Sequence, residues 1–103
     1  MPEDRQEPLK EPLGNDEAKK LIGEIARTGT VTFVPHAIKA MADDNLTAVD
    51  CTNVLRGGWV EFSEPHGAEW RYRIRTARIV VIVAFESRGE LRVVTVWRMR
   101  EGR

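Results

Sequence analysis

The sequence predicts one α+β domain, in which three helices from the N-terminal half pack on a four-stranded antiparallel sheet from the C-terminal half. Its 103 residues are enough for one hydrophobic core and too few for two. Apolar residues recur at helical spacing before Gly58, and they alternate with polar residues after it. The longest apolar run, residues 79–85, is far shorter than the roughly 20 residues that a membrane helix needs. We therefore expect a globular domain with no membrane partner.

Residues 1–14 are expected to form a flexible tail outside the domain, which would span residues 15–103. This segment holds three prolines among charged side chains, with few apolar groups to stabilise an ordered conformation. The start of the chain has neither the basic region nor the apolar region of a signal peptide. A lone cysteine, Cys51, cannot form an intrachain disulfide, as is usual in reducing compartments. Both features predict a cytoplasmic protein.

Three helices are predicted from their capping residues and their apolar periodicity. Asn15 begins the first helix, and Gly29 follows its end. Pro35 begins the second, because proline is well suited to the first helical position. Thr47 and Asp50 have the spacing of a capping box at the start of the third.

Four strands are expected after the third helix, because the period of the apolar pattern changes to two. They cover residues 59–62, 69–76, 79–85 and 91–99. The third of them is almost entirely apolar and β-branched, as in a central strand covered on both faces. Residues 30–34 also alternate, and they predict a short strand or an extended lead-in to the second helix.

Strict alternation sorts the side chains of the second and fourth strands onto two faces. One face would carry Trp70, Tyr72, Ile74, Leu91, Val93, Thr95, Trp97 and Met99. The other would carry Arg71, Arg73, Arg75, Arg92, Arg98 and Arg100. In an antiparallel meander these two strands flank the central one, about 10 Å apart. Helices would cover the aromatic face and leave the arginines toward solvent or a groove.

Arginine dominates the charge of the sheet half. From Arg56 onward the chain has ten arginines, six acidic residues and no lysine, although the net charge of the whole chain is zero. Planar guanidinium groups bind phosphate and carboxylate through paired hydrogen bonds. Such a platform could hold a phosphodiester backbone and stabilise the charge of a phosphorane. Alternatively, the arginines form a solvated face that keeps strand edges from pairing.

Few other side chains suggest chemistry. His36 and His66 could transfer protons near neutral pH, although each is more simply a surface or structural group. Tyr72 is most simply a core aromatic residue. No H-E-x-x-H motif and no C-x-x-C pair is present, so we expect no metal site. No glycine-rich loop follows a strand and opens a helix, and we expect no cofactor.

Residues 32–41 read Thr-Phe-Val-Pro-His-Ala-Ile-Lys-Ala-Met. They resemble the F-x-x-H-A-x-x-R-M opening of a family of small bacterial proteins near the MqsR, BrnT and RelE toxins, with alanine at the motif's arginine. Residues 18–31 and 48–57 are similar to the first helix and strand, and to a glycine-ended helix, of MqsR-type toxins. Residues 91–98 resemble the last strand of BrnT-type toxins. The resemblance covers residues 16–100 and implies a RelE-like or MqsR-like fold.

This resemblance implies a metal-independent endoribonuclease, an mRNA interferase toxin of a type II toxin–antitoxin system. Such enzymes cleave RNA by attack of a 2′-hydroxyl on the adjacent phosphate, and a cognate antitoxin protein inhibits them. The substrate would be RNA, including mRNA on the ribosome, in a bacterial cytoplasm. By position, the catalytic residues would be His36, Tyr72, Arg73 and Arg98. The RNA-binding residues would be Arg71, Arg75, Arg100 and His66.

Two other functions stay open. The arginine face could belong to a non-catalytic binding module that holds RNA or an acidic partner protein with salt-sensitive affinity. In a structural or regulatory subunit, the same arginines would instead be paired with Glu61, Glu64, Glu69 or Glu86.

Overall fold

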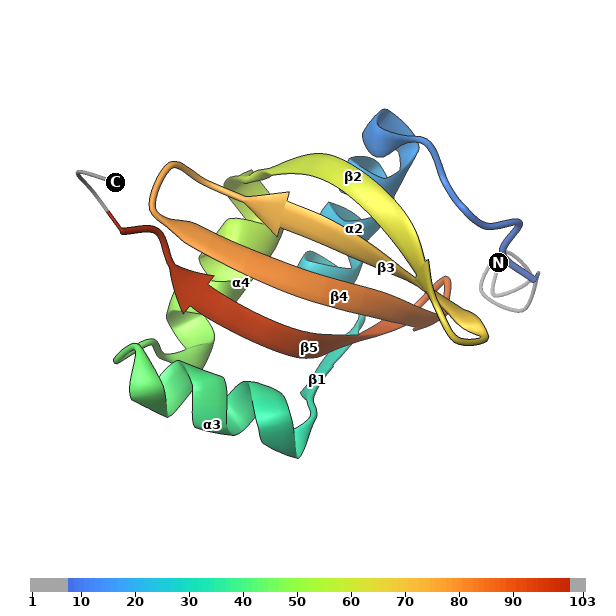
Figure 1. The fold of residues 1–103 in the computed structure, drawn as a ribbon. Coiled ribbons are helices and arrows are strands. Elements are labelled where there is room, and N and C mark those ends of the chain that lie inside the picture. The colour runs from blue at the N-terminus through green and yellow to red at the C-terminus, as the bar shows by residue number, and fades with distance from the viewer. Residues whose placement is uncertain (1–7, 101–103) are drawn as a thin grey trace.

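The computed structural model describes residues 8–100, and its helices and strands follow the predicted order (Figure 1). The helices are α2 (Asn15–Thr28), α3 (Pro35–Asp43) and α4 (Ala48–Gly57). The strands are β1 (Thr30–Phe33), β2 (Trp59–His66), β3 (Glu69–Arg75), β4 (Ile79–Ser87) and β5 (Glu90–Arg98). The α+β class is therefore confirmed. Of the expected tail, residues 1–7 lie outside the described residues.

The sheet has five strands and is mixed, so the expected four-stranded antiparallel sheet is incomplete. Strands β2 to β5 form the predicted antiparallel meander, and the strand order is β1-β5-β4-β3-β2. The additional strand is β1, which pairs in parallel with β5 from Thr30 opposite Glu90 to Phe33 opposite Val93. These partners are about 60 residues apart in the chain. A four-residue alternation carries no information about such a distant partner. The pattern of residues 30–34 therefore could not decide between a short strand and an extended lead-in to the second helix.

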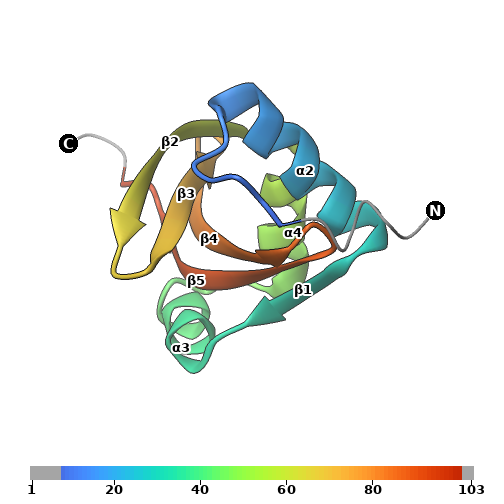
Figure 2. The same ribbon diagram turned by 90° about the vertical axis from the view of Figure 1, so that its right-hand side faces the viewer.

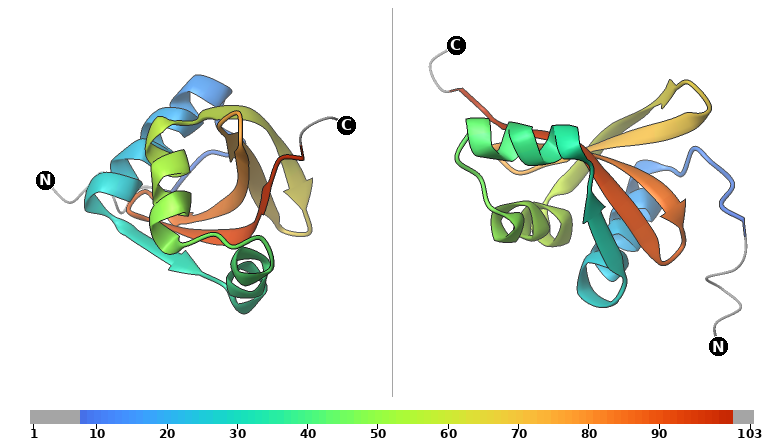
Figure 3. Two further views of the ribbon diagram at one scale, coloured as in Figure 1. Left: turned by 90° about the vertical axis from the view of Figure 1, so that its left-hand side faces the viewer. Right: turned by 90° about the horizontal axis from the view of Figure 1, so that it is seen from below.

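The helices leave one face of the sheet open. In Figure 1 strands β2 to β5 lie in front, and α2 and α4 lie behind them. Figure 2 shows the sheet curving around these two helices, with α3 beside β5 at its edge. The two views in Figure 3 show the same arrangement from the other side and from below. No helix of the described chain covers the opposite face of the sheet, which we call the open face.

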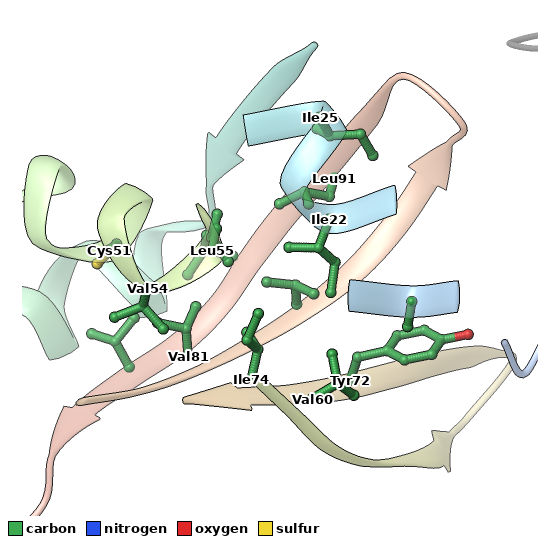
Figure 4. Close-up of a cluster of buried hydrophobic side chains, with 14 of the residues drawn as sticks. Ile22, Ile25, Cys51, Val54, Leu55, Val60, Tyr72, Ile74, Val81 and Leu91 are labelled. Carbon is green, nitrogen blue, oxygen red and sulfur yellow. The ribbon is translucent and has the colours of Figure 1, made fainter. Parts of the chain in front are cut away.

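The hydrophobic core lies between the curved sheet and helices α2 and α4. Figure 4 shows part of it, with Ile22, Ile25, Cys51, Val54, Leu55, Val60, Tyr72, Ile74, Val81 and Leu91 labelled. Leu13 also belongs to this cluster and is only 5% exposed, although the sequence placed it in the flexible tail. Two leucines among prolines and charges, Leu9 and Leu13, are too few for a periodic signal, and the burial of Leu13 depends on contacts that only the fold creates.

Helix capping matches the predictions at two of three N-termini. Thr47 and Asp50 form the expected capping box, with reciprocal bonds of 3.1 Å and 2.9 Å to each other's backbone N–H groups. Pro35 occupies the first turn of α3 as predicted. The cap of α2 is Gly14 rather than Asn15. Asn15 instead donates its side-chain amide to the carbonyl of Glu61 at 3.1 Å, which joins α2 to β2.

Candidate functional site

Two β-bulges decide which side chains reach the open face. In β2, Val60 pairs with Ile74 and Phe62 pairs with Arg73, so Glu61 is the extra residue. In β5, the register changes between the partners of Ile82 and Val83, and Val94 is the extra residue. A bulge adds one residue to one strand, so the alternation of faces changes phase beyond it.

The bulge in β5 overturns the predicted faces of that strand. Beyond it, Val96 is buried at 2% exposure, and Trp97 pairs with Val80 on the open face. Arg98 pairs with Ile79, which packs against the core on the helix side. The two arginine-bearing strands therefore do not present Arg73 and Arg98 on one face, as strict alternation predicted.

Arginines and aromatic rings are stacked on the open face. The guanidinium carbon of Arg73 lies 5.6 Å from the ring centre of Phe62 and 5.2 Å from that of Trp97. The guanidinium carbon of Arg75 lies 5.6 Å from the ring centre of Trp59. Stacking of this kind is favourable and holds a guanidinium group in a defined plane. Sequence reasoning missed these pairs, because each joins residues from different strands whose register was not known.

Three glutamates form ion pairs with four arginines of the open face. Glu61 approaches Arg73 Nε at 2.7 Å without hydrogen-bond alignment, and it accepts a bond from Arg75 Nη1 at 3.5 Å. At the other end of the face, Glu69 accepts from Arg71 Nε at 2.9 Å. The remaining pairs join Arg92 to Glu69 and to Glu86. The pairing expected of a structural subunit is thus present for three of the four glutamates.

Glu69 is the centre of the second ion-pair group. Partial burial raises the pKa of its carboxyl, but hydrogen bonds from Arg92 and Arg71 outweigh that effect and hold the pKa below its usual value. The hydrogen bonds that Arg92 donates to Glu69 and Glu86 raise the pKa of its guanidinium, although its partial burial opposes this. Glu69 is therefore an ionised bridge between β3 and β5 at neutral pH.

The stacked and paired side chains cover a second buried layer. Val80 and Ala84 on β4 are 0% and 1% exposed, yet neither belongs to the core cluster on the helix side. In the sheet register Val80 lies between Arg75 and Trp97, and Ala84 lies opposite Arg92. The apolar stems of arginines commonly cover such surface. The expectation that β4 is covered on both faces is confirmed, with arginines and tryptophan in place of a helix on one of them.

Arg71 and Arg73 still have unused donors. Both contact their glutamates through Nε, and their Nη groups make no hydrogen bond to any described residue. The two residues are alternate positions of β3, so their side chains are about 7 Å apart on one face. Each Nη pair is a fork that suits a carboxylate or a phosphate oxygen.

Tyr72 lies on the helix side of β3, away from these forks. Its hydroxyl accepts a bond from the backbone N–H of Leu13 and donates one to Glu11 Oε2, both at 2.9 Å. Burial, opposed by the Leu13 bond and assisted by the charge of Glu11, raises the pKa of Tyr72 above its usual value. The proposed catalytic partners Tyr72 and Arg73 are adjacent in sequence and on opposite faces of the sheet.

Arg98 clamps the C-terminal end of α3. Its Nε donates to the carbonyl of Asp44 at 2.8 Å, and its Nη2 donates to the carbonyl of Asn45 at 3.0 Å. The Arg98 backbone N–H donates to Asp44 Oδ2 at 2.7 Å, while Arg100 makes a longer contact of 3.4 Å with the same carboxylate. Arg98 therefore uses its Nε and Nη2 groups to hold the backbone at the end of α3.

Neither histidine joins a catalytic group. His36 is exposed in the first turn of α3, about 13 Å along the nine-residue helix from the end that Arg98 clamps. His66 is exposed at the end of β2 beside the turn. The four residues expected to act in catalysis thus lie in four separate places, and the structure does not bring them together.

Within residues 8–100, no three His, Cys, Asp or Glu side chains gather to hold a metal ion, and no helix is long and apolar enough to cross a membrane. Comparisons of the chain with protein-family models, with curated proteins and with solved structures found no match.

Proposed function

We propose that this protein is a non-catalytic binding module, whose open face binds an acidic segment of a partner protein. The observation that carries this proposal is the pair of forks on Arg71 and Arg73, which are held in position through Nε and keep their Nη donors unused. Preorganised arginines lose little side-chain entropy when they bind a carboxylate. Carboxylates at alternate positions of an extended segment would have the same spacing as the forks, about 7 Å.

Exposed aromatic side chains support a protein partner. Trp59 and Phe62 are 48% and 43% exposed, and both lie on the open face beside the stacked arginines. Aromatic residues and arginine are the types most enriched at the centres of protein interfaces. An acidic partner segment would therefore also find apolar and aromatic contacts beside the forks.

The charge of the open face favours protein over RNA. Its four arginines, Arg71, Arg73, Arg75 and Arg92, already face three ion-paired glutamates, and the exposed Glu64 lies opposite Arg71 in the register. RNA binding depends on many cations that displace counterions along a run of phosphates, whereas this face offers two unused forks, which match two carboxylates. The RNA-cleaving toxin remains a prediction, and the dispersal of His36, Tyr72 and Arg98 does not support it.

The test compares two probes under the same conditions. One probe is a fluorescein-labelled peptide of alternating Glu and Thr, about ten residues long, and the other is a labelled oligouridylate of similar length. Each probe is titrated with the protein at about 50 and 200 mM salt. We expect the peptide to bind, and to bind at least about tenfold more weakly to the double variant Arg71→Gln, Arg73→Gln. The control is Arg27→Gln, which removes one arginine at an exposed position of α2 and should bind as the parent does.

The other outcomes each contradict the proposal. Cleavage of oligouridylate that the double variant loses would establish the ribonuclease instead. Oligouridylate binding without cleavage, stronger than peptide binding, would make RNA the ligand of the open face. Equal peptide binding by the double variant and the Arg27→Gln control would show that the forks are not the site, and absence of all binding would leave the arginines a structural role.

A further inference from the structure

Residues 9–13, which we call the strap, lie across the open end of the curved sheet. Figure 2 shows this segment running from the N-terminal side, in front of the sheet and helix α4, to the start of α2. Leu13 is 5% exposed within the core, and Leu9 packs against the same cluster with partial burial. The strap is therefore an irregular segment that closes one end of the hydrophobic core.

Tyr72 provides the polar part of the strap's binding site. Figure 4 shows its hydroxyl at the end of the labelled cluster, directed toward the N-terminal segment. All hydrogen bonds of that hydroxyl within the described residues go to the strap, one to the Glu11 carboxylate and one from the Leu13 N–H. The buried Tyr72 hydroxyl thus binds a carboxylate as a donor and a backbone amide as an acceptor, and these two groups belong to residues two positions apart.

Few interactions hold the strap in place. No backbone-to-backbone hydrogen bond connects residues 9–13 to the rest of the described chain. Each ordered residue loses conformational entropy, and here the compensation comes from one buried leucine, one half-buried leucine and the bonds of a single hydroxyl. Segments with so few anchoring contacts open locally, without unfolding of the domain.

The sequence of this region repeats the tripeptide that fills the site. Glu-Pro-Leu occurs at residues 7–9 and again at residues 11–13, separated only by Lys10. The second copy supplies the Glu carboxylate, the Leu amide and the Leu side chain that the site uses. Those three groups are all that the contacts require, so any chain with Glu-Pro-Leu carries the matching ligand.

We propose that the region under the strap, where the Tyr72 hydroxyl and the core around Leu13 contact residues 11–13, is an exchangeable peptide-binding site for Glu-Pro-Leu segments. Residues 11–13 occupy it in cis, and a Glu-Pro-Leu segment supplied in trans displaces them. Only molecules whose strap is open can bind the trans ligand. The apparent affinity is therefore the intrinsic affinity multiplied by the fraction of open molecules. This site is on the opposite side of β3 from the arginine forks and is independent of the function proposed for them.

The experiment weakens the cis occupant and adds the ligand. A fluorescein-labelled peptide with the sequence of residues 10–14 is titrated into the parent protein and into Leu13→Ala. We expect Leu13→Ala to bind the peptide at least about tenfold more tightly, because its own strap competes poorly. Adding Tyr72→Phe should reverse most of that gain, and a peptide with Ala in place of Leu should not bind. Val49→Ala, on an exposed position of α4, should bind as the parent does.

Two results would overturn the proposal. One is equal peptide affinity in the parent and Leu13→Ala, or affinity that Tyr72→Phe leaves unchanged. The other comes from native-state hydrogen exchange of the parent protein and does not depend on whether Leu13→Ala folds. An exchangeable strap requires the Leu13 amide to exchange at least about a hundredfold faster than the slowest core amides. Exchange of Leu13 at the rate of those amides would mean that the strap leaves only when the whole domain unfolds.

Discussion

Replacing Arg98 by alanine is expected to destabilise the fold, because the structure makes this residue a clamp rather than a catalyst. Its guanidinium donates to two carbonyls, those of Asp44 and Asn45, at the end of α3. Asn45 has a φ of 55°, in the left-handed region that side-chain-bearing residues seldom adopt. The clamp therefore holds both the end of a helix and a residue with an unfavourable backbone conformation.

The expected loss follows from these two bonds. A hydrogen bond contributes about 1 kcal/mol net, and a carbonyl that loses its partner while partly buried costs a similar amount. Two such bonds, one partly buried and one exposed, predict a loss of about 2 kcal/mol in the free energy of unfolding. For a domain of 103 residues this corresponds to a fall in Tm of roughly 9 °C.

Urea and thermal denaturation, followed by circular dichroism, measure this loss directly. The matched control is Arg100→Ala, because Arg100 is 70% exposed and makes one 3.4 Å contact with Asp44. That variant should lose less than about 0.5 kcal/mol. Arg98→Lys should recover less than half of the loss, since an ammonium group lacks the fork that reaches both carbonyls. Equal stability of the two alanine variants would refute the clamp, and would return Arg98 to the list of candidate catalytic residues.

Two further predictions concern the buried layers. Val80→Ala should lower the free energy of unfolding by about 2 kcal/mol, because Val80 is fully buried beneath the open face. Urea denaturation measures this loss, and the control Val49→Ala, on the exposed surface of α4, should lose almost nothing. Burial, with a smaller effect of the Asp50 charge, raises the pKa of the Cys51 thiol from 9.0 to about 11. Because the folded state binds the Cys51 proton more tightly, this thiol should cost about 2–3 kcal/mol of stability as the pH rises from 9 to 11. Cys51→Ala should lack this part of the loss and keep the part that the raised pKa of Tyr72 adds above pH 10.

Local features of the chain were predictable to the extent that their causes are local. The capping box of Thr47 and Asp50 needs only residues three apart, and it forms as the spacing predicts. The meander of β2 to β5 follows from short connections between neighbouring strands. The pairing of β1 with β5 and the burial of Leu13 depend on segments distant in sequence, and no short window of residues contains them.

The candidate site was less predictable than the fold, because a bulge changes which face of the sheet the following side chains occupy. One extra residue, Val94, moves Trp97 onto the open face and Arg98 onto the helix side. A period of two fits the sequence on both sides of the bulge, but the two stretches are out of phase with each other. Any set of side chains assembled across such a position by counting alone will combine residues from opposite faces, as the expected group of Arg73 and Arg98 did.

Alternating arginines on a strand can therefore have a structural role or a binding role, and only the register between strands distinguishes the two. Where the opposite strand presents acidic residues, the guanidinium groups are neutralised and cover apolar side chains, as Arg75 covers Val80 with Glu61 beside it. Where an arginine contacts its glutamate through Nε and not through Nη, its outer nitrogens stay available to a ligand, as in Arg71 and Arg73. Both situations occur here on one strand. The structural role of the face thus does not exclude a binding role, because the same glutamates that neutralise the arginines also hold the forks of Arg71 and Arg73 in position for a second carboxylate.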